Sequence, residues 1–265
     1  MPYTHSGRIL NRHKNGYEDT RVALRQENRN FYQTVENMPS TKDQKLPDQL
    51  AFWDGWHRRR GATGKDSIHR KIRSTFLGKL PDTNKNPDVL DLGCGKGHDL
   101  RAMALAGCNV WGIDFSAVAI EQARTIVPHR TRMLRKVKRS LQVWDISKPL
   151  PFHDESFDGI FSHLALHYFR DNATRQIFSE IHRVLKPRGV LVFCVKSTDD
   201  PYYGDGEKLD EHIFNRCGHI RHFFDEGYVK DLLHDWQIEM IETHLGRYAS
   251  TKESAFISTV AYKSV

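Results

Sequence analysis

The stretch that decides the fold is VLDLGCGKG, Val89 to Gly97, in which a short apolar run ends in a glycine-rich loop. Residues 88–92 read DVLDL and predict a buried β-strand, and the residues after Gly97 carry apolar side chains at helical spacing. Glycines let the backbone turn tightly and let a ligand approach it, and the next helix presents free N–H groups at its start. The stretch therefore predicts a strand, a ligand-binding loop and a helix in succession.

Further along the chain, strand-like apolar runs alternate with segments of helical periodicity. The strand-like runs are Asn109–Phe115, Leu141–Ile146, Phe157–His163 and Val190–Val195. Between the last two, Asp171–Lys186 has one apolar face and predicts a helix that Pro187 ends. Strands that alternate with helices favour right-handed crossovers, so the sequence predicts an α/β fold with a doubly wound, mostly parallel sheet.

The C-terminal part of the chain departs from this alternation. A helix is predicted near Glu226–His234, and the runs Gln237–His244 and Ala255–Tyr262 are predicted to pair as an antiparallel hairpin at the sheet edge. Before them, Ser197–Phe214 is long and polar and predicts a loop after the fifth strand. Long loops at this end of a sheet commonly carry substrate contacts.

Composition limits the class of protein. The chain has 265 residues, of which 38% are hydrophobic and 28% charged, which is enough for one well-cored domain with an appendage. No run approaches about 18 apolar residues and the N-terminus has no apolar signal segment, so we expect a soluble, cytoplasmic protein. The four cysteines are scattered without CxxC spacing, which argues against a zinc site or a disulfide framework.

Positive charge is concentrated in the N-terminal third. The net charge is +7, and residues 1–80 hold sixteen Lys/Arg against eight Asp/Glu, so the rest of the chain sums to about −1. Such an excess favours an anionic partner such as RNA or a phosphorylated metabolite. We expect a basic, partly ordered extension at 1–50, a helical lid at 51–80 and the main domain at 81–265. A second basic block, Arg130–Arg139, suits either phosphate contact or a solvated surface.

Acidic side chains follow the ends of the predicted strands. Asp114 ends the second strand and Asp145 the third, while Asp91 lies just before the glycine loop. A dinucleotide-binding loop would carry GxGxxG, but the last position of that pattern is His98, so the loop is GxGxG. Asp114 is placed to bind both hydroxyls of a ribose. Acids around such a loop favour a ligand with a ribose and an amino group over one with a pyrophosphate.

Five motifs together resemble the class I S-adenosylmethionine-dependent methyltransferases. They are VLDLGCGKG (89–97), GIDFS (112–116), WDISKPLPFHDESFD (144–158), FSHLALHY (161–168) and EIHRVLKPRGVLVF (180–193). The resemblance spans about residues 79–262 and is specifically to the small-molecule group, similar to ubiquinone/menaquinone and biotin-pathway methyltransferases. It implies a seven-stranded sheet with one antiparallel strand, S-adenosyl-L-methionine as cofactor, and methyl transfer to a nucleophilic atom of a small-molecule acceptor.

The resemblance also implies which residues contact the cofactor. They are Asp91, Gly93, Cys94, Gly95, Gly97, Asp114, Phe115, Ser116, Asp145, Ile146, Ser162 and Trp53. Asp114 would bind the ribose hydroxyls, Asp145 with Ile146 would meet the adenine, and Asp91 would help to hold the amino group. Trp53 would close over the cofactor, since aromatic faces favour a sulfonium cation, although it equally suits the core side of a helix.

Candidates for the acceptor side come from three segments. His163 and His167 follow the fourth strand, where a histidine can take a proton from the acceptor or simply pack against the pocket. The candidate acceptor-binding residues are Trp56, Tyr202, Tyr203 and His222. The acids between residues 199 and 210 fit no calcium loop, so no metal is expected.

Two other functions fit the residues less closely. One is an RNA or protein methyltransferase that docks through the basic N-terminal third. No RNA-binding signature is present, however, and the fourth strand ends in FSHL rather than in the (D/N)PP(Y/F) of nucleic-acid amino-methyltransferases. The other is a non-catalytic, cofactor-binding subunit that activates a partner. We therefore expect a small-molecule acceptor, no nucleic-acid or membrane partner, and a monomer or homodimer.

Overall fold

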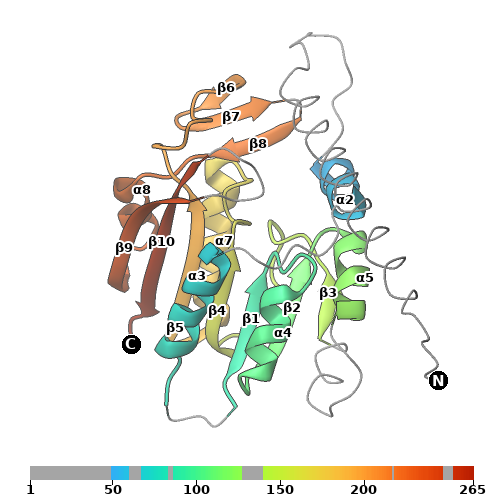
Figure 1. Cartoon of the computed structure of the whole chain (residues 1–265). Helices are drawn as coiled ribbons and strands as arrows, with labels where there is room; N and C mark the ends of the chain where they lie inside the picture. The colour runs from blue at the N-terminus through green and yellow to red at the C-terminus, as the bar shows by residue number, and fades with distance from the viewer. Residues whose placement is uncertain (1–48, 60–66, 83–85, 127–139, 217, 247–252) are drawn as a thin grey trace, which may run out of the picture. The chain divides into compact units, whose positions relative to one another are not determined.

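The computed structural model describes residues 49–59, 67–82, 86–126, 140–216, 218–246 and 253–265 (Figure 1). The predicted N-terminal extension up to residue 48 and the basic block Arg130–Arg139 lie outside these ranges. Within them, no helix is long and apolar enough to cross a membrane.

A seven-stranded sheet forms the centre of the described chain (Figure 1). Its strands, in spatial order, are β3 (Leu141–Val143), β2 (Asn109–Asp114), β1 (Asp88–Leu92), β4 (Phe157–His163), β5 (Leu185–Lys196), β10 (Ser254–Lys263) and β9 (Trp236–Gly246). β10 runs antiparallel to both of its neighbours, and the pairings among β1 to β5 are parallel. The predicted mostly parallel sheet with one antiparallel strand is confirmed, as is the C-terminal hairpin at its edge.

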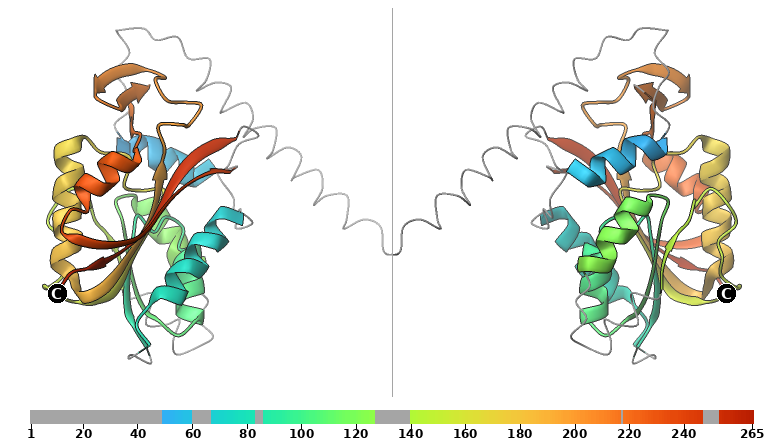
Figure 2. Two further views of the ribbon diagram at one scale, coloured as in Figure 1. Left: turned by 90° about the vertical axis from the view of Figure 1, so that its left-hand side faces the viewer. Right: turned by 90° about the vertical axis from the view of Figure 1, so that its right-hand side faces the viewer.

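Helices cover both faces of this sheet (Figure 2). They are α2 (Gln49–Arg59), α3 (Ser67–Lys79), α4 (His98–Leu105), α5 (Ala117–Ile126), α7 (Asp171–Val184) and α8 (Glu226–Leu232). Side chains alternate between the two faces along a strand, so Val89 of β1 is buried with α3, α4 and α5, whereas Leu90 is buried with α7 and α8. The period-two pattern of this strand therefore sets which helices lie on which face.

The predicted lid, residues 51–80, contains two helices with different surroundings. Phe76 of α3 is fully buried and its ring centroid lies 5.4 Å from that of Phe161 in β4, so α3 belongs to the core. α2 instead contacts α5 and β8 near the carboxyl ends of the strands. A boundary between lid and domain at residue 81 stays a prediction, and within the proposed lid it is α2 that contributes to the cavity described below.

The helix predicted over Asp171–Lys186 ends earlier. α7 stops at Val184 and β5 begins at Leu185, so the chain passes directly from helix to strand. Proline has no N–H to donate and disfavours helical backbone at the residue before it. Pro187 therefore ends the helix before the proline itself is reached.

The polar segment predicted as a long loop contains strands. β6 (Glu207–Asp210), β7 (Ile213–Arg216) and β8 (His219–His222) form a second, antiparallel sheet. The loop prediction for Ser197–Phe214 is wrong for β6 and for Ile213 and Phe214 of β7. Ile213 and Phe214 are buried, and His212 turns the chain between the two strands with a left-handed backbone, φ 57°. Strands of four residues are too short to show a clear alternation of polar and apolar side chains.

Candidate functional site

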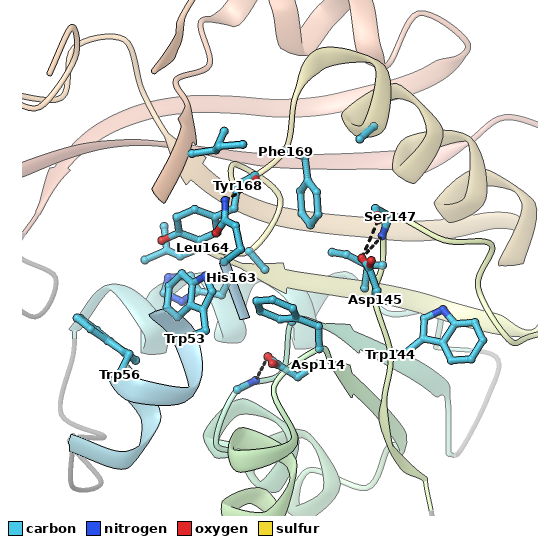
Figure 3. A pocket seen from close by; sticks show the side chains of 18 of the residues that line it. Trp53, Trp56, Asp114, Trp144, Asp145, Ser147, His163, Leu164, Tyr168 and Phe169 are labelled. Atoms are coloured by element: carbon cyan, nitrogen blue, oxygen red, sulfur yellow. Dashed lines mark hydrogen bonds between the residues drawn. The ribbon is translucent and has the colours of Figure 1, made fainter. Parts of the chain in front are cut away.

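A cavity of about 440 Å³ opens at the carboxyl ends of the parallel strands, beneath α2 (Figure 3). Its size suits a small organic ligand. Many residues predicted from the sequence line it, namely Trp53, Trp56, Gly93, Gly95, Asp114, Phe115, Asp145, Ile146 and His163. These predicted residues come from five separate parts of the chain and meet at the position where ligands bind in doubly wound sheets.

The glycine loop forms one wall of this cavity. Gly93 and Gly95 have left-handed backbones, with φ of 71° and 51°. A Cβ atom on Gly93 would stand 2.2 Å from the Cβ of Ala165, and one on Gly95 would stand 3.6 Å from the Cε1 of His57 in α2. The loop is thus confined between α2 and the segment after β4, and it accommodates residues without side chains.

We expect Gly93→Ala to lower stability and to weaken ligand binding in the cavity. The new methyl group must displace Ala165, and its left-handed backbone adds a strain of about 1 to 3 kcal/mol. Gly107→Ala is the matched control, because Gly107 also has a left-handed backbone, φ 103°, but has nothing within 4 Å of the added Cβ. Urea unfolding of both variants measures the difference, and equal losses would contradict the proposed clash.

Asp114, at the end of β2, is held by the loop that it faces. Its two carboxylate oxygens accept the backbone N–H groups of Gly95 and Ser116, each at 2.9 Å. Burial raises the pKa of Asp114 to about 6, the two amide hydrogen bonds act in the opposite direction, and nearby Asp54 of α2 raises it further. Each oxygen keeps a second lone pair, so the carboxylate can also accept hydroxyl groups from a ligand.

Asp91, at the end of β1, is almost fully buried beneath the lining. Its Oδ2 atom has no hydrogen-bond partner among the described residues. Burial raises the pKa of this carboxyl well above its ordinary value, and the neighbouring acids Asp99 and Asp114 raise it further. Buried carboxylates are rarely left unpaired, so a cationic or hydrogen-bonding group of a ligand would satisfy this oxygen.

Other predicted cofactor residues lie behind the wall and support it. Ser116 Oγ accepts the N–H of Ala119 and caps α5, and it donates to Asp54 in α2 at 2.5 Å. Ser162 Oγ donates to the carbonyl of Leu92 at 2.9 Å and ties β4 to β1.

Cys94 and Gly97, also predicted to contact the cofactor, are absent from the cavity lining. Cys94 is buried, and burial raises the pKa of its thiol. A Cβ on Gly97 would meet that of Ala123 at 3.0 Å, so this glycine lets α4 and α5 approach each other.

The far end of the cavity is formed by the segment after β3. Asp145 accepts hydrogen bonds from the backbone N–H and the hydroxyl of Ser147, at 2.9 and 2.7 Å, so its carboxylate is fixed by a local turn. Ile146 and Phe115 add apolar surface beside it. Figure 3 shows Asp145 and Ser147 at one end, Trp53, His163, Leu164 and Tyr168 at the other, and Asp114 between them.

Aromatic rings connect α2 with the rest of the cavity. The ring of Trp53 lies edge-on to that of Tyr168, with centroids 4.9 Å apart, and 6.0 Å from that of Trp56. Phe52, beside Trp53, stacks on His219 of β8 at 4.2 Å. These contacts hold α2 against both the segment after β4 and the small sheet.

The two histidines near the end of β4 have different positions: His163 is the last residue of the strand, and His167 follows it. His163 is part of the cavity lining. His167 lies outside the lining and is 1% exposed, and neither of its ring nitrogens has a hydrogen-bond partner among the described residues. Burial lowers the pKa of His167 well below 6.5, with further lowering by Lys196 and Arg221.

The acceptor-binding residues predicted between residues 202 and 222 are absent from the cavity lining. Tyr202, Tyr203 and His222 are not among its lining residues. The hydroxyl of Tyr203 bonds the Nδ1 of His212 at 2.7 Å, and His222 is buried, which lowers its pKa to about 4. Ile220 of β8 is the residue that this segment contributes to the lining.

Several lining residues were not predicted. They are Gln49, His57, Trp144, Ser147, Leu164, Ala165, Tyr168, Phe169, Arg170, Ala173 and Ile220. Five of these eleven lie within the quoted motifs, such as Trp144 before Asp145 and Tyr168 at the end of FSHLALHY. Arg170, His57 and Ile220 gave no comparable signal, because their places depend on how α7, α2 and β8 pack.

Residues 90–193 match the family described as "Methyltransferase domain". These residues, fewer than half of the chain, are similar to a methyltransferase domain. The matched residues run from β1 to β5 and include the glycine loop, Asp114 and His163. The resemblance to S-adenosylmethionine-dependent methyltransferases, predicted from the sequence, is confirmed.

Individual proteins agree with this domain assignment. An uncharacterized methyltransferase of Synechocystis sp. is 35% identical over 103 residues, covering 39% of this chain and 44% of that protein. A malonyl-[acyl-carrier protein] O-methyltransferase of Legionella pneumophila is 28% identical over 181 residues, covering 63% and 61%. The chain thus spans about half the length of these two relatives. An S-adenosylmethionine-dependent methyltransferase structure from Methanosarcina mazei shares the fold, with a TM-score of 0.59, 24% identity and coverage of 69% and 94%.

Proposed function

We propose that this protein binds S-adenosylmethionine in the cavity beneath α2 and transfers its methyl group to a small-molecule acceptor. The observation that carries this proposal is the Asp114 carboxylate, which two loop N–H groups orient beside Gly95 at the cavity wall. A fixed, buried carboxylate next to a glycine loop suits the paired hydroxyls of a ribose.

The remaining donors fit the rest of the cofactor. One buried oxygen of Asp91 has no hydrogen-bond partner within the described ranges, and an ammonium group would satisfy it. Asp145, Ile146 and Phe115 offer a polar edge and apolar faces to a planar base. When bound, S-adenosylmethionine supplies the reactive methyl group, so the protein has to bind and align the two reactants.

The acceptor would enter at the end of the cavity formed by Trp53, Leu164 and Tyr168 (Figure 3). His163 is the better candidate for a base, because it lines the cavity. His167 lies behind the lining, fully enclosed, and the role we propose for it is to support the wall. A relative named for a carrier-bound malonyl group supports an acceptor other than nucleic acid.

Calorimetry tests the cofactor directly. We expect saturable binding of S-adenosylmethionine and of S-adenosylhomocysteine, and no comparable binding of NAD, because the loop lacks the GxGxxG pattern. A preference for NAD would overturn the proposal. Labelled S-adenosylmethionine offered with pools of candidate acceptors would then identify the class of atom that is methylated.

The alternative is an RNA or protein methyltransferase that docks through the basic N-terminal third. We expect removal of residues 1–40 to leave cofactor affinity within about twofold and to weaken only nonspecific binding to polyanions. The measurement compares the full chain and the shortened chain in cofactor calorimetry and in RNA binding at two salt concentrations. Activity that required RNA and fell steeply with salt would favour the alternative.

A further inference from the structure

The cavity has an uneven distribution of charge. Asp114 and Asp145 line the part assigned above to the cofactor, with Asp91 buried beneath the loop. Among the described lining residues, Arg170 is the one lysine or arginine. Arg170 is exposed and precedes the first residue of α7, so it is the lining residue that can offer a positive charge to an anionic acceptor.

The backbone of Arg170 is held firmly while its guanidinium stays available. Its carbonyl begins α7 by accepting the backbone N–H of Thr174 at 2.9 Å and the Thr174 hydroxyl at 3.1 Å. The neighbouring acid, Asp171, is bound instead by Arg175 at 3.0 Å and by the hydroxyl of Tyr228 at 2.6 Å. Within the described part of the chain, Arg170 itself forms no ion pair.

The surfaces near Arg170 suit a flat, apolar body. Phe169 precedes it in the lining, and Tyr168 and Trp53 meet edge-on, so the wall offers ring faces and edges. Ile220 of β8 adds an aliphatic contact. Aromatic walls with one charged donor favour a planar ligand that carries an anionic group.

We propose that the acceptor is a planar carboxylate, held through its carboxylate by Arg170 and through its ring by Trp53, Tyr168 and Phe169. Guanidinium groups bind carboxylates through two parallel hydrogen bonds, which fix the orientation of the ligand as well as its affinity. The inference rests on the proposed function, because it places the acceptor beside a bound cofactor.

Calorimetry on the full-length protein saturated with S-adenosylhomocysteine tests the inference. The probes are benzoate, phenylacetate and cinnamate, each paired with its primary amide, together with phenyl phosphate. We expect at least one carboxylate to bind about tenfold more tightly than its amide, since a hydrogen bond to a charged group is stronger than one to a neutral group. Tighter binding of phenyl phosphate than of every carboxylate would overturn the carboxylate assignment.

Variants of Arg170 distinguish binding of the carboxylate by this residue from a general effect of the protein's charge on carboxylate affinity. Arg170→Gln should weaken the carboxylate about tenfold and leave its amide unchanged, and Arg170→Lys should fall between them. Arg101→Gln is the matched control, because Arg101 is exposed on α4 and does not line the cavity. Equal affinities in wild type and Arg170→Gln, or carboxylates that bind no tighter than amides, would overturn the inference. Absence of S-adenosylhomocysteine binding would instead overturn the proposed function.

Discussion

Asp114→Ala is expected to weaken the binding of S-adenosylhomocysteine about a hundredfold or more. The variant removes a charged acceptor that we assign to two hydroxyl groups of the ligand, and each hydrogen bond to a charged group contributes roughly 1.5 to 3 kcal/mol. It also removes the acceptor for the N–H groups of Gly95 and Ser116, so the loop loses its support at the same time. Calorimetry on the purified variant measures the loss.

A second variant of Asp114 separates the effect of its charge from that of its size, and a variant elsewhere serves as the control. Asp114→Asn keeps the size and one acceptor oxygen, so its loss of affinity reports mainly the charge. Asp82→Asn, at an exposed position outside the cavity, should bind like the wild type. Unchanged affinity in Asp114→Ala, with an intact thermal transition, would show that the ribose is not held here.

The pH dependence of ligand binding tests the role of Asp114 independently. The pKa of Asp114 lies at about 6 because the carboxyl is buried. Hydroxyl donors favour the ionised form, so ligand binding should release a proton near pH 6 and affinity should fall as the pH drops below that value. Calorimetry in two buffers of different ionisation enthalpy counts the protons. Adenosine serves as the ligand, because it lacks the amino group assigned to Asp91, and Asp114→Asn should abolish the release.

The sheet, and the part of the cavity that we assign to the cofactor, have signals in the sequence that are local. The run around Val89 and Leu90 is short, apolar and followed at once by glycines, so strand, loop and helix are all visible within one segment. Asp114 is the last residue of β2 and Asp145 lies two residues after β3, and parallel strands bring their carboxyl ends to one edge of the sheet. Sequence position alone therefore places these acids near the loop.

The acceptor half depends on contacts between segments that are distant in the chain. Ile220 reaches the lining through a small sheet whose four-residue strands carry no clear periodicity. His163 and His167 are four residues apart, but Leu164 between them has a left-handed backbone, φ 57°. No rule for a leucine predicts that turn. His163 lines the cavity and His167 is enclosed behind it, although nothing in the sequence around them distinguishes their positions.

Lowering the pH from 7.5 to 5.5 is expected to lower the free energy of unfolding. His57, His167, His219 and His222 are all buried, and burial lowers the pKa of each, to about 4 for His57 and His222. The unfolded chain takes up protons on these side chains near pH 6.5, while the folded chain does not. Stability due to them is therefore full above about pH 6.5 and is lost as the pH falls toward the folded values.

Two buried carboxyls act in the opposite direction. The pKa values of Asp91 and Asp114 are raised, so the folded chain binds protons there more readily than the unfolded chain and gains stability as the pH falls. Four histidines outweigh two carboxyls, and each unbalanced group changes the free energy of unfolding by about 1.4 kcal/mol per pH unit. Urea unfolding midpoints at pH 7.5, 6.5 and 5.5 measure the net slope.

The variant His167→Phe tests whether the histidine enclosed behind the cavity wall contributes to the loss of stability at low pH. It removes one enclosed titratable group, which has no hydrogen-bond partner among the described residues, and keeps a ring of similar size. The variant should therefore lose about 1 kcal/mol less than the wild type between pH 7.5 and 5.5. His153→Phe is the control, because His153 is exposed and should follow the wild-type curve. If His167→Phe also follows that curve, water reaches His167 in solution, and the wall formed by the segment after β4 and by β8 opens enough to admit a proton.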